Sequence, residues 1–363
     1  MSHFWLVDFV DCIERYYIQT FPFLCCPSKR LRTMAALLLL VGGPSGANIS
    51  PNRGHSRGRA MKILFWIAIL GAGLLMPGAS AKADYEVMTR NDILFAEHDG
   101  VRLLGDFYAP KGVEKAPVLV AVHGGGWQVG NRKFYTNWGP YLAKNGFAVF
   151  AIEYRLMKPD VKAYPGAVYD TKAAVQYIRA NAGELGIDPE RIGMVGDSAG
   201  AHLSALVALA GEEPAFSSEY RSDAHVSVPA KVKAVVGFYG VYDMLAQWEH
   251  DLLARPRDNI SEKFLGAAPY TNRQIFFEAS PISYTTADKN SMRFLLIHGD
   301  HDDIVDPATQ STAFLAALKR AGFFARTVVI PGAGHFFVTD PVDDTSFGGF
   351  AGPKVVRFLK DVL

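Results

Sequence analysis

Residues 194–203 read MVGDSAGAHL, a stretch that places Ser198 between two glycines, Gly196 and Gly200. The apolar run 192–195 before it is typical of a buried strand, and residues 199–210 after it read as an apolar helix. A serine on so sharp a strand-to-helix turn presents its hydroxyl at the N-terminus of the helix, and flanking glycines avoid clashes within the turn. The stretch therefore makes Ser198 a candidate nucleophile.

Short apolar runs alternate with helical patterns on both sides of this turn. The runs that read as strands are 117–123, 147–154, 192–195, 232–238, 292–298 and 326–330, and residues 85–108 read as a hairpin around Asp99-Gly100. Helical patterns cover 168–181, 306–320 and 353–362. Residues 241–280 interrupt the alternation of strands and helices, which suggests a small helical insertion. This alternation predicts an α/β fold, with a mostly parallel sheet that helices cover on both faces.

A serine hydroxyl is a weak nucleophile, so it needs a base and a group that orients the base. His335 lies in the glycine-rich stretch 331–336 (PGAGHF), directly after a predicted strand. Acidic residues follow the strand 292–298 in the stretch HGDHDDIVD (298–306). The chain order is therefore serine, then acid, then histidine, as in enzymes with a nucleophile elbow.

Four aspartates compete for the role of the acid. Asp306 precedes the proline that starts a predicted helix, so its carboxylate is expected to cap amide groups there. Asp300 comes two residues after the strand and is expected to serve the turn. Asp302 and Asp303 remain, and they are expected to point in different directions because they are adjacent.

The stretch HGGGW (123–127) is expected to supply hydrogen-bond donors to a negatively charged oxygen. It directly follows the strand 117–122, and its glycines let the backbone approach a ligand closely. Backbone N–H groups stabilise the oxyanion of a tetrahedral intermediate. We expect Gly125 and Gly126, together with Ala199, to form such an oxyanion hole, but the sequence leaves open which glycine amides point inward.

Three aromatic residues follow predicted strand ends, and they are candidates for contact with a substrate. They are Trp127, Tyr154 and Tyr239, and packing in the core is the alternative for each of them. His202 lies one turn into the helix after Ser198, where a packed histidine is expected and a base is not.

These motifs together resemble those of the α/β-hydrolase esterases, in particular the branch similar to hormone-sensitive lipase and its bacterial relatives similar to feruloyl esterases. The resemblance covers roughly residues 100–363 and rests on HGGGW (123–127), EYRL (153–156), GDSAGAHL (196–203), HGDHDDIV (298–305) and PGAGHFF (331–337). It implies an eight-stranded sheet and a triad of Ser198, Asp302 and His335, since the pattern HG-x-x-D-x-x-V places the acid at Asp302. It also implies no cofactor, and hydrolysis of carboxylic esters through an acyl-enzyme.

One departure from the pattern narrows the expected substrates. In the group of hormone-sensitive lipase the segment YRL usually continues with Ala-Pro-Glu, whereas here it continues with Met157-Lys158-Pro159. This favours relatives that act on short-chain, aryl or carbohydrate esters over lipases. Two alternatives remain: an amide hydrolase with the same triad, similar to arylformamidases or peptidases, and a non-catalytic binding module with this fold.

The N-terminal part of the chain predicts export. Residues 61–83 combine a basic start, an apolar stretch of 14 residues and a small-x-small cleavage site, as a signal peptide does. The mature chain is then expected to begin at Lys82 or Asp84, to be secreted or periplasmic, and to keep no membrane anchor. An uncleaved anchor is the alternative. Residues 1–60 are interpreted as an extension or leader, and 84–363 as the catalytic domain.

Composition excludes several classes of function. The chain has 363 residues and a formal net charge of +1, which gives no electrostatic reason to expect a nucleic-acid partner. Its three cysteines are Cys12, Cys25 and Cys26, so the remainder of the chain has no disulfide, thiolate metal site or cysteine nucleophile. The acidic and histidine residues of 298–306 match neither the spacing of a calcium loop nor that of a zinc site, so we expect no metal.

Overall fold

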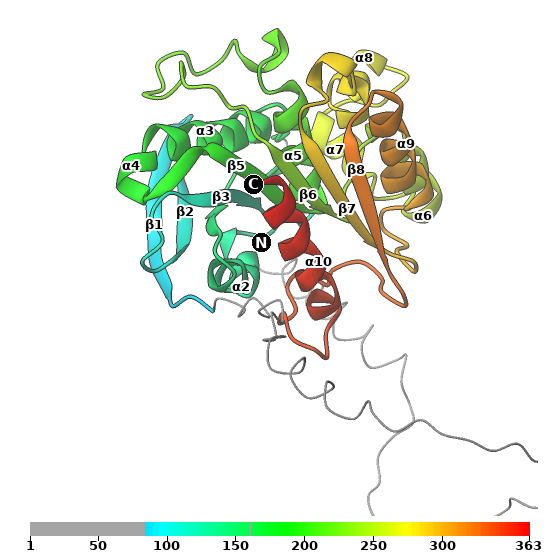
Figure 1. Ribbon diagram of the computed structural model, residues 1–363. Helices are drawn as coiled ribbons and strands as arrows, with labels where there is room; N and C mark the ends of the chain where they lie inside the picture. The colour runs from blue at the N-terminus through cyan, green and yellow to red at the C-terminus, as the bar shows by residue number, and fades with distance from the viewer. Residues whose placement is uncertain (1–83, 160) are drawn as a thin grey trace, which may run out of the picture. The chain divides into compact units, whose positions relative to one another are not determined.

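The centre of the molecule is an eight-stranded sheet in the computed structural model, which describes residues 84–159 and 161–363. The strands are β1 (Val87–His98), β2 (Val101–Pro110), β3 (Ala116–Val122), β4 (Ala148–Ile152), β5 (Ile187–Asp197), β6 (Ala234–Phe238), β7 (Arg293–Gly299) and β8 (Phe324–Ile330). They lie side by side in the order β1-β2-β4-β3-β5-β6-β7-β8 (Figure 1). Six strands run parallel to one another, namely β4, β3, β5, β6, β7 and β8. Strand β2 is antiparallel to both of its neighbours, β1 and β4.

The antiparallel edge of the sheet is the predicted hairpin. Strands β1 and β2 are joined by Asp99 and Gly100, which have φ angles of 51° and 74°. Two consecutive residues with positive φ form the kind of tight turn that matches the twist of a hairpin, and Asp-Gly is a favoured pair for it. The hairpin, the parallel strands and the strand count confirm the predicted sheet.

Helices cover both faces of this sheet. They are α2 (Trp138–Lys144), α3 (Gly166–Ala180), α4 (Ala182–Leu185), α5 (Ala199–Ala210), α6 (Met244–Ala254), α7 (Ile260–Leu265), α8 (Arg273–Glu278), α9 (Ala313–Arg320) and α10 (Phe347–Val362). Helices α2 and α10 pack with one face of the sheet, while α3, α5 and α9 pack with the other (Figure 1).

The pattern of β3 shows why the strand is buried on both faces. Val118, Val120 and Val122 belong to the core on one side, and Leu119 and Ala121 belong to the core on the other. Successive side chains of a strand point to opposite faces, so an unbroken apolar run is what a central strand between two helical layers requires. This is the physical reason for the apolar runs in the sequence.

The insertion expected at 241–280 is present as the short helices α6, α7 and α8. Polar side chains at their N-termini accept hydrogen bonds from backbone N–H groups that the helix leaves free. Asp243 caps α6, Asn259 caps α7 and Asn272 caps α8 in this way. These caps define where three helices of only 6 to 11 residues begin.

The last helix begins earlier than predicted. The sequence suggested a start at Pro353, but α10 starts at Phe347, because the Ser346 side chain accepts a hydrogen bond from the N–H of Gly349 and caps the helix. Pro353 therefore lies inside the helix, where its missing N–H removes one backbone hydrogen bond. The strand predicted at 192–195 is also longer, since β5 begins at Ile187 beyond an irregularity in its pairing with β3.

The predicted signal peptide (61–83) and the segment 1–60 lie outside the described residues, so both remain predictions. Among the residues that the structure describes, no helix has the length and apolar character needed to cross a membrane.

Candidate active site

Ser198 occupies the turn between β5 and α5, with φ 50° and ψ −118°. Positive φ is uncommon for a residue with a side chain, and such strain occurs at sites where the surrounding structure enforces it. A Cβ on Gly200 would lie 1.9 Å from the carbonyl oxygen of Val122, and one on Gly196 would lie 2.4 Å from the Gly200 carbonyl. The two glycines are therefore required by the close approach of backbone segments around Ser198.

The structure brings His335 between Ser198 and Asp302. The Ser198 Oγ lies 3.0 Å from Nε2 of His335, and Nδ1 of His335 lies 2.8 Å from Oδ2 of Asp302. The second carboxylate oxygen of Asp302 accepts hydrogen bonds from the backbone N–H groups of Ile304 and Val305, both at 3.0 Å. Because the side chains of Asp302 and His335 are almost completely buried, water does not compete for these contacts.

The other three aspartates of this stretch point elsewhere. Asp300 accepts a hydrogen bond from the N–H of Gly332 at 2.7 Å, and Asp306 accepts from the N–H groups of Ala308 and Thr309 at the start of the following helix. Asp303 is exposed. Of the four candidates, the structure places Asp302 against His335.

The loop HGGGW follows β3 and has an unusual backbone. Gly125 and Gly126 have φ angles of 106° and 58°, values that residues with side chains rarely adopt. Gly124 differs, because its N–H donates to Oδ1 of Asp197 at 3.0 Å. Within the described part of the chain, no residue accepts a hydrogen bond from the N–H groups of Gly125, Gly126 or Ala199. These three predicted donors are therefore free to bind a ligand.

Asp197 was not singled out from the sequence, although it directly precedes Ser198. Its carboxylate lies in the core and accepts hydrogen bonds from the N–H of Gly124 at 3.0 Å and from the hydroxyl of Tyr135 at 3.2 Å. Burial raises the pKa of Asp197 to about 7. The residue ties the loop after β3 to the turn after β5. An acidic residue at the end of an apolar strand was the only available signal.

The three aromatic residues predicted to contact substrate are packed in the core, and their contact with a substrate stays a prediction. Trp127, Tyr154 and Tyr239 are buried, with 1%, 4% and 1% of their surfaces exposed. Each uses its polar atom within the protein: Trp127 donates to His202, Tyr154 donates to the carbonyl of His123, and the hydroxyl of Tyr239 accepts from the N–H of Val338. These contacts hold the loops around the site.

His202 is held as a neutral imidazole. The indole N–H of Trp127 donates to its Nδ1 at 3.2 Å, and its Nε2 lies 2.7 Å from the carbonyl oxygen of Ala279, to which it donates. A proton on Nδ1 would face a second donor, and burial lowers the pKa of His202 to about 4. The residue links the loop 123–127 to the insertion and, as expected, is packed.

This arrangement predicts a loss of stability in mild acid. Unfolding frees His202 to bind a proton below pH 6.5, whereas the folded state resists protonation down to about pH 4. The unfolded state then holds more protons, so the free energy of unfolding falls as pH falls from 6.5 to about 4, by about 1.4 kcal/mol per unit for this residue. Replacing His202 by Gln removes the titrating group, and we expect a flatter curve in urea unfolding at pH 7, 6 and 5. Equal slopes for the two proteins would contradict this account.

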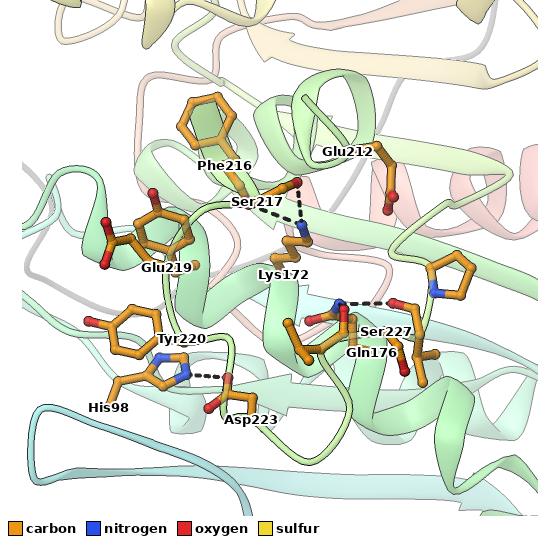
Figure 2. A pocket seen from close by; sticks show the side chains of 14 residues that line it. His98, Lys172, Gln176, Glu212, Phe216, Ser217, Glu219, Tyr220, Asp223 and Ser227 are labelled. Carbon is orange, nitrogen blue, oxygen red and sulfur yellow. Dashed lines mark hydrogen bonds and ion pairs between the residues drawn. The ribbon is translucent and has the colours of Figure 1, made fainter. Parts of the chain in front are cut away.

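A cavity of about 250 Å³ lies on α3 and the segment that follows α5, and no triad residue lines it (Figure 2). Its polar groups bind one another: Nε2 of His98 lies 2.8 Å from Asp223, and Lys172 donates to Ser217 at 3.1 Å. Gln176 donates to the carbonyl of Val228 at 2.8 Å. These contacts fasten the segment 212–229 to α3 and to the end of β1, which is a structural role.

A metal site in the described residues would need side chains that could together bind the ion. The structure groups no three histidine, cysteine or acidic side chains as a metal site within residues 84–159 and 161–363. Asp300 and Asp306 instead accept hydrogen bonds from backbone N–H groups, and Asp302 binds backbone N–H groups and His335.

Comparisons with known proteins agree with the fold. Residues 105–318 match the BD-FAE family. The chain is 35% identical over 229 residues to the esterase LipQ of Mycobacterium tuberculosis, covering 61% of this chain and 51% of that protein. The chain spans about half the length of the curated relatives it matches.

Solved structures of esterases share this architecture. The thermophilic esterase Est2 of Thermogutta terrifontis with propionate bound superposes with a TM-score of 0.61 at 25% identity, covering 77% of this chain and 95% of that one. A truncated carbohydrate esterase from gut microbiota gives the same TM-score and identity, covering 77% of this chain and 98% of that one. The match over more than half of the chain, together with the eight-stranded sheet, shows that the chain belongs to the BD-FAE family, with the α/β-hydrolase fold of its esterase relatives.

Proposed function

We propose that the protein is a serine hydrolase that cleaves carboxylic esters through an acyl-enzyme. The observation that carries the proposal is the position of His335, whose two ring nitrogens lie within 3.0 Å of Ser198 Oγ and 2.8 Å of Asp302 Oδ2. A nucleophile, a base and an orienting acid in this sequence of contacts form a complete catalytic triad.

The first half of the reaction begins at Ser198. Its Oγ attacks the ester carbonyl carbon while Nε2 of His335 takes the hydroxyl proton. Asp302 accepts the Nδ1–H of His335, which keeps Nε2 free as the base and stabilises the imidazolium that forms. The two backbone N–H groups on Oδ1 hold the Asp302 carboxylate in place during this step.

The carbonyl oxygen becomes an oxyanion in the tetrahedral intermediate, and it needs hydrogen-bond donors that are already in place. The N–H groups of Gly125 and Gly126, on the loop after β3, and of Ala199, at the start of α5, are unused in the described structure. Gly124 is not a candidate, because its N–H is bound to Asp197. That bond instead fixes the loop, so that the neighbouring amides need not reorganise when the charge develops.

The second half of the reaction returns the enzyme to its starting state. His335 gives its proton to the oxygen of the leaving alcohol, the tetrahedral intermediate collapses, and the acyl group stays on Ser198. A water molecule then attacks the acyl carbon while His335 takes one of its protons. His335 returns this proton to Ser198 Oγ as the second tetrahedral intermediate collapses and the carboxylic acid departs. No step requires a cofactor or metal.

The substrates proposed are short-chain or carbohydrate esters. The insertion consists of short helices and their connections, with exposed charges such as Glu249, Arg257 and Asp258, rather than a long apolar cover. The related Est2 binds propionate, and another relative is a carbohydrate esterase. The propionate in Est2 supports a small acyl group, and the carbohydrate esterase supports a carbohydrate ester.

A panel of p-nitrophenyl esters tests the proposal. We expect the highest kcat/KM for acetyl to butyryl esters and a lower value for the dodecanoyl ester, and we expect a serine-directed phosphonate to label Ser198. Acetylated xylan and feruloyl sugars extend the panel to natural classes of ester. A dodecanoyl ester cleaved faster than a butyryl ester would contradict the acyl preference. Faster cleavage of a p-nitroanilide than of the matching ester would favour an amide hydrolase.

A further inference from the structure

The insertion touches the proposed oxyanion hole through Ile260. This residue is the first of α7, and a Cβ placed on Gly126 would lie 2.3 Å from its Cδ1. The end of the Ile260 side chain therefore packs directly on the backbone of Gly126. A substrate whose carbonyl oxygen is bound by the amides of Gly125 and Gly126 must lie next to this side chain.

The strand order of the sheet indicates which part of the ester, the alcohol or the acyl group, lies near Ile260. Strand β3, which carries the loop 123–127, lies on one side of β5, and β6, β7 and β8 lie on the other. His335 follows β8, and it must reach the leaving oxygen to protonate it, so the alcohol lies on that side of Ser198. The oxyanion faces the amides of the loop on the β3 side. The acyl chain leaves the same carbon away from the alcohol, so it starts beside this loop, where Ile260 packs on Gly126.

We propose that Ile260 is the specificity-determining residue that limits the length of the acyl group. The inference rests on the ester hydrolysis proposed above, and it names the side chain that blocks a longer acyl group. Ile260 is half-buried and apolar, so it can pack against one or a few methyl or methylene groups. A longer chain must either displace Ile260 or leave the site.

Displacing Ile260 is difficult because α7 is anchored on several sides. The ring of Phe264 stacks on Trp127 with centroids 4.4 Å apart. The buried carboxylate of Asp251 accepts hydrogen bonds from the N–H and the hydroxyl of Ser261, at 3.4 and 3.0 Å. These contacts join α7 to the loop 123–127 and to α6, so the position of Ile260 is fixed by packing in the core.

Changing the size of Ile260 in both directions tests the proposal. Ile260→Ala should raise the ratio of kcat/KM for p-nitrophenyl octanoate to that for the acetate by about tenfold or more, because a pocket discriminates by about that factor per methylene group. Ile260→Phe should lower the ratio of butyrate to acetate. Each ratio is measured on one preparation, so it does not depend on the fraction of the variant that folds.

Leu253→Ala is the matched control. Leu253 belongs to α6 of the same insertion, it is similar in size, and 88% of its surface is exposed. Its ratios should stay at the wild-type values. Ratios that remain within about twofold of wild type in both Ile260 variants would overturn the proposal. So would a change in the preference among acetates of different alcohols without a change in acyl preference.

The phosphonate probe separates this inference from the proposed function. If the wild-type protein cleaves esters and Ser198 is labelled while the ratios stay constant, the function stands and the role of Ile260 is wrong. If the wild-type protein cleaves no ester and the probe does not label Ser198, the proposed function fails, and the inference fails with it.

Discussion

Ser198→Ala is expected to lower kcat for ester hydrolysis by a factor of about 10⁴ to 10⁶. The substitution removes the oxygen that lies 3.0 Å from His335 Nε2 and leaves no group that can form the acyl-enzyme. The fold should be unchanged. Alanine and serine both carry a Cβ, so the strain at φ 50° is the same for either residue, and the serine hydroxyl caps no helix N–H.

Ser204→Ala is the control for this variant. Ser204 is buried in the same helix, and its hydroxyl has no hydrogen-bond partner among the described residues. Loss of that hydroxyl should leave kcat near the wild-type value. Both variants are measured on p-nitrophenyl butyrate, with circular dichroism to verify the fold. Activity of more than a few per cent in purified Ser198→Ala, with contamination excluded, would disprove the role of Ser198.

The sheet could be predicted because its strands are marked by local patterns. Buried strands need apolar residues on both faces, and the resulting runs, such as 117–122, stand out in the sequence. Asp-Gly at 99–100 marks the hairpin turn for an equally local reason. The start of α10 was missed because two local signals compete: Pro353 is a common start, but Ser346 supplies the cap.

The side chains around the site were harder to predict, because their directions depend on distant segments. Position after a strand end made Trp127 and Tyr239 candidates for substrate contact, but their polar atoms face His202 and the N–H of Val338. Asp197 likewise has its role only because the loop after β3 lies within 3.0 Å of it. Sequence spacing identifies which loops meet at one edge of a sheet, but it does not show which side chains turn towards one another.

Asp302→Asn is expected to lower kcat by about 10⁴, the loss seen for this change in a well-studied serine protease. Oδ1 of Asp302 accepts two backbone N–H groups, and an asparagine would keep its carbonyl oxygen there. The amide NH₂ would then face Nδ1 of His335, where the carboxylate Oδ2 now lies at 2.8 Å. His335 would be driven to the tautomer with its proton on Nε2, and it could no longer take the proton of Ser198.

Asp303→Asn gives the matched comparison, since it is the same change at the adjacent residue. Asp303 is exposed, and among the described residues only its backbone carbonyl is hydrogen-bonded, to Nε2 of His250 at 3.0 Å. An exposed charge is screened by solvent and salt, so this variant should lose at most about tenfold in kcat. Both variants are assayed on the same chromogenic ester at the same pH. A large loss in Asp303→Asn with a small loss in Asp302→Asn would transfer the role of the acid to Asp303, against the geometry around His335.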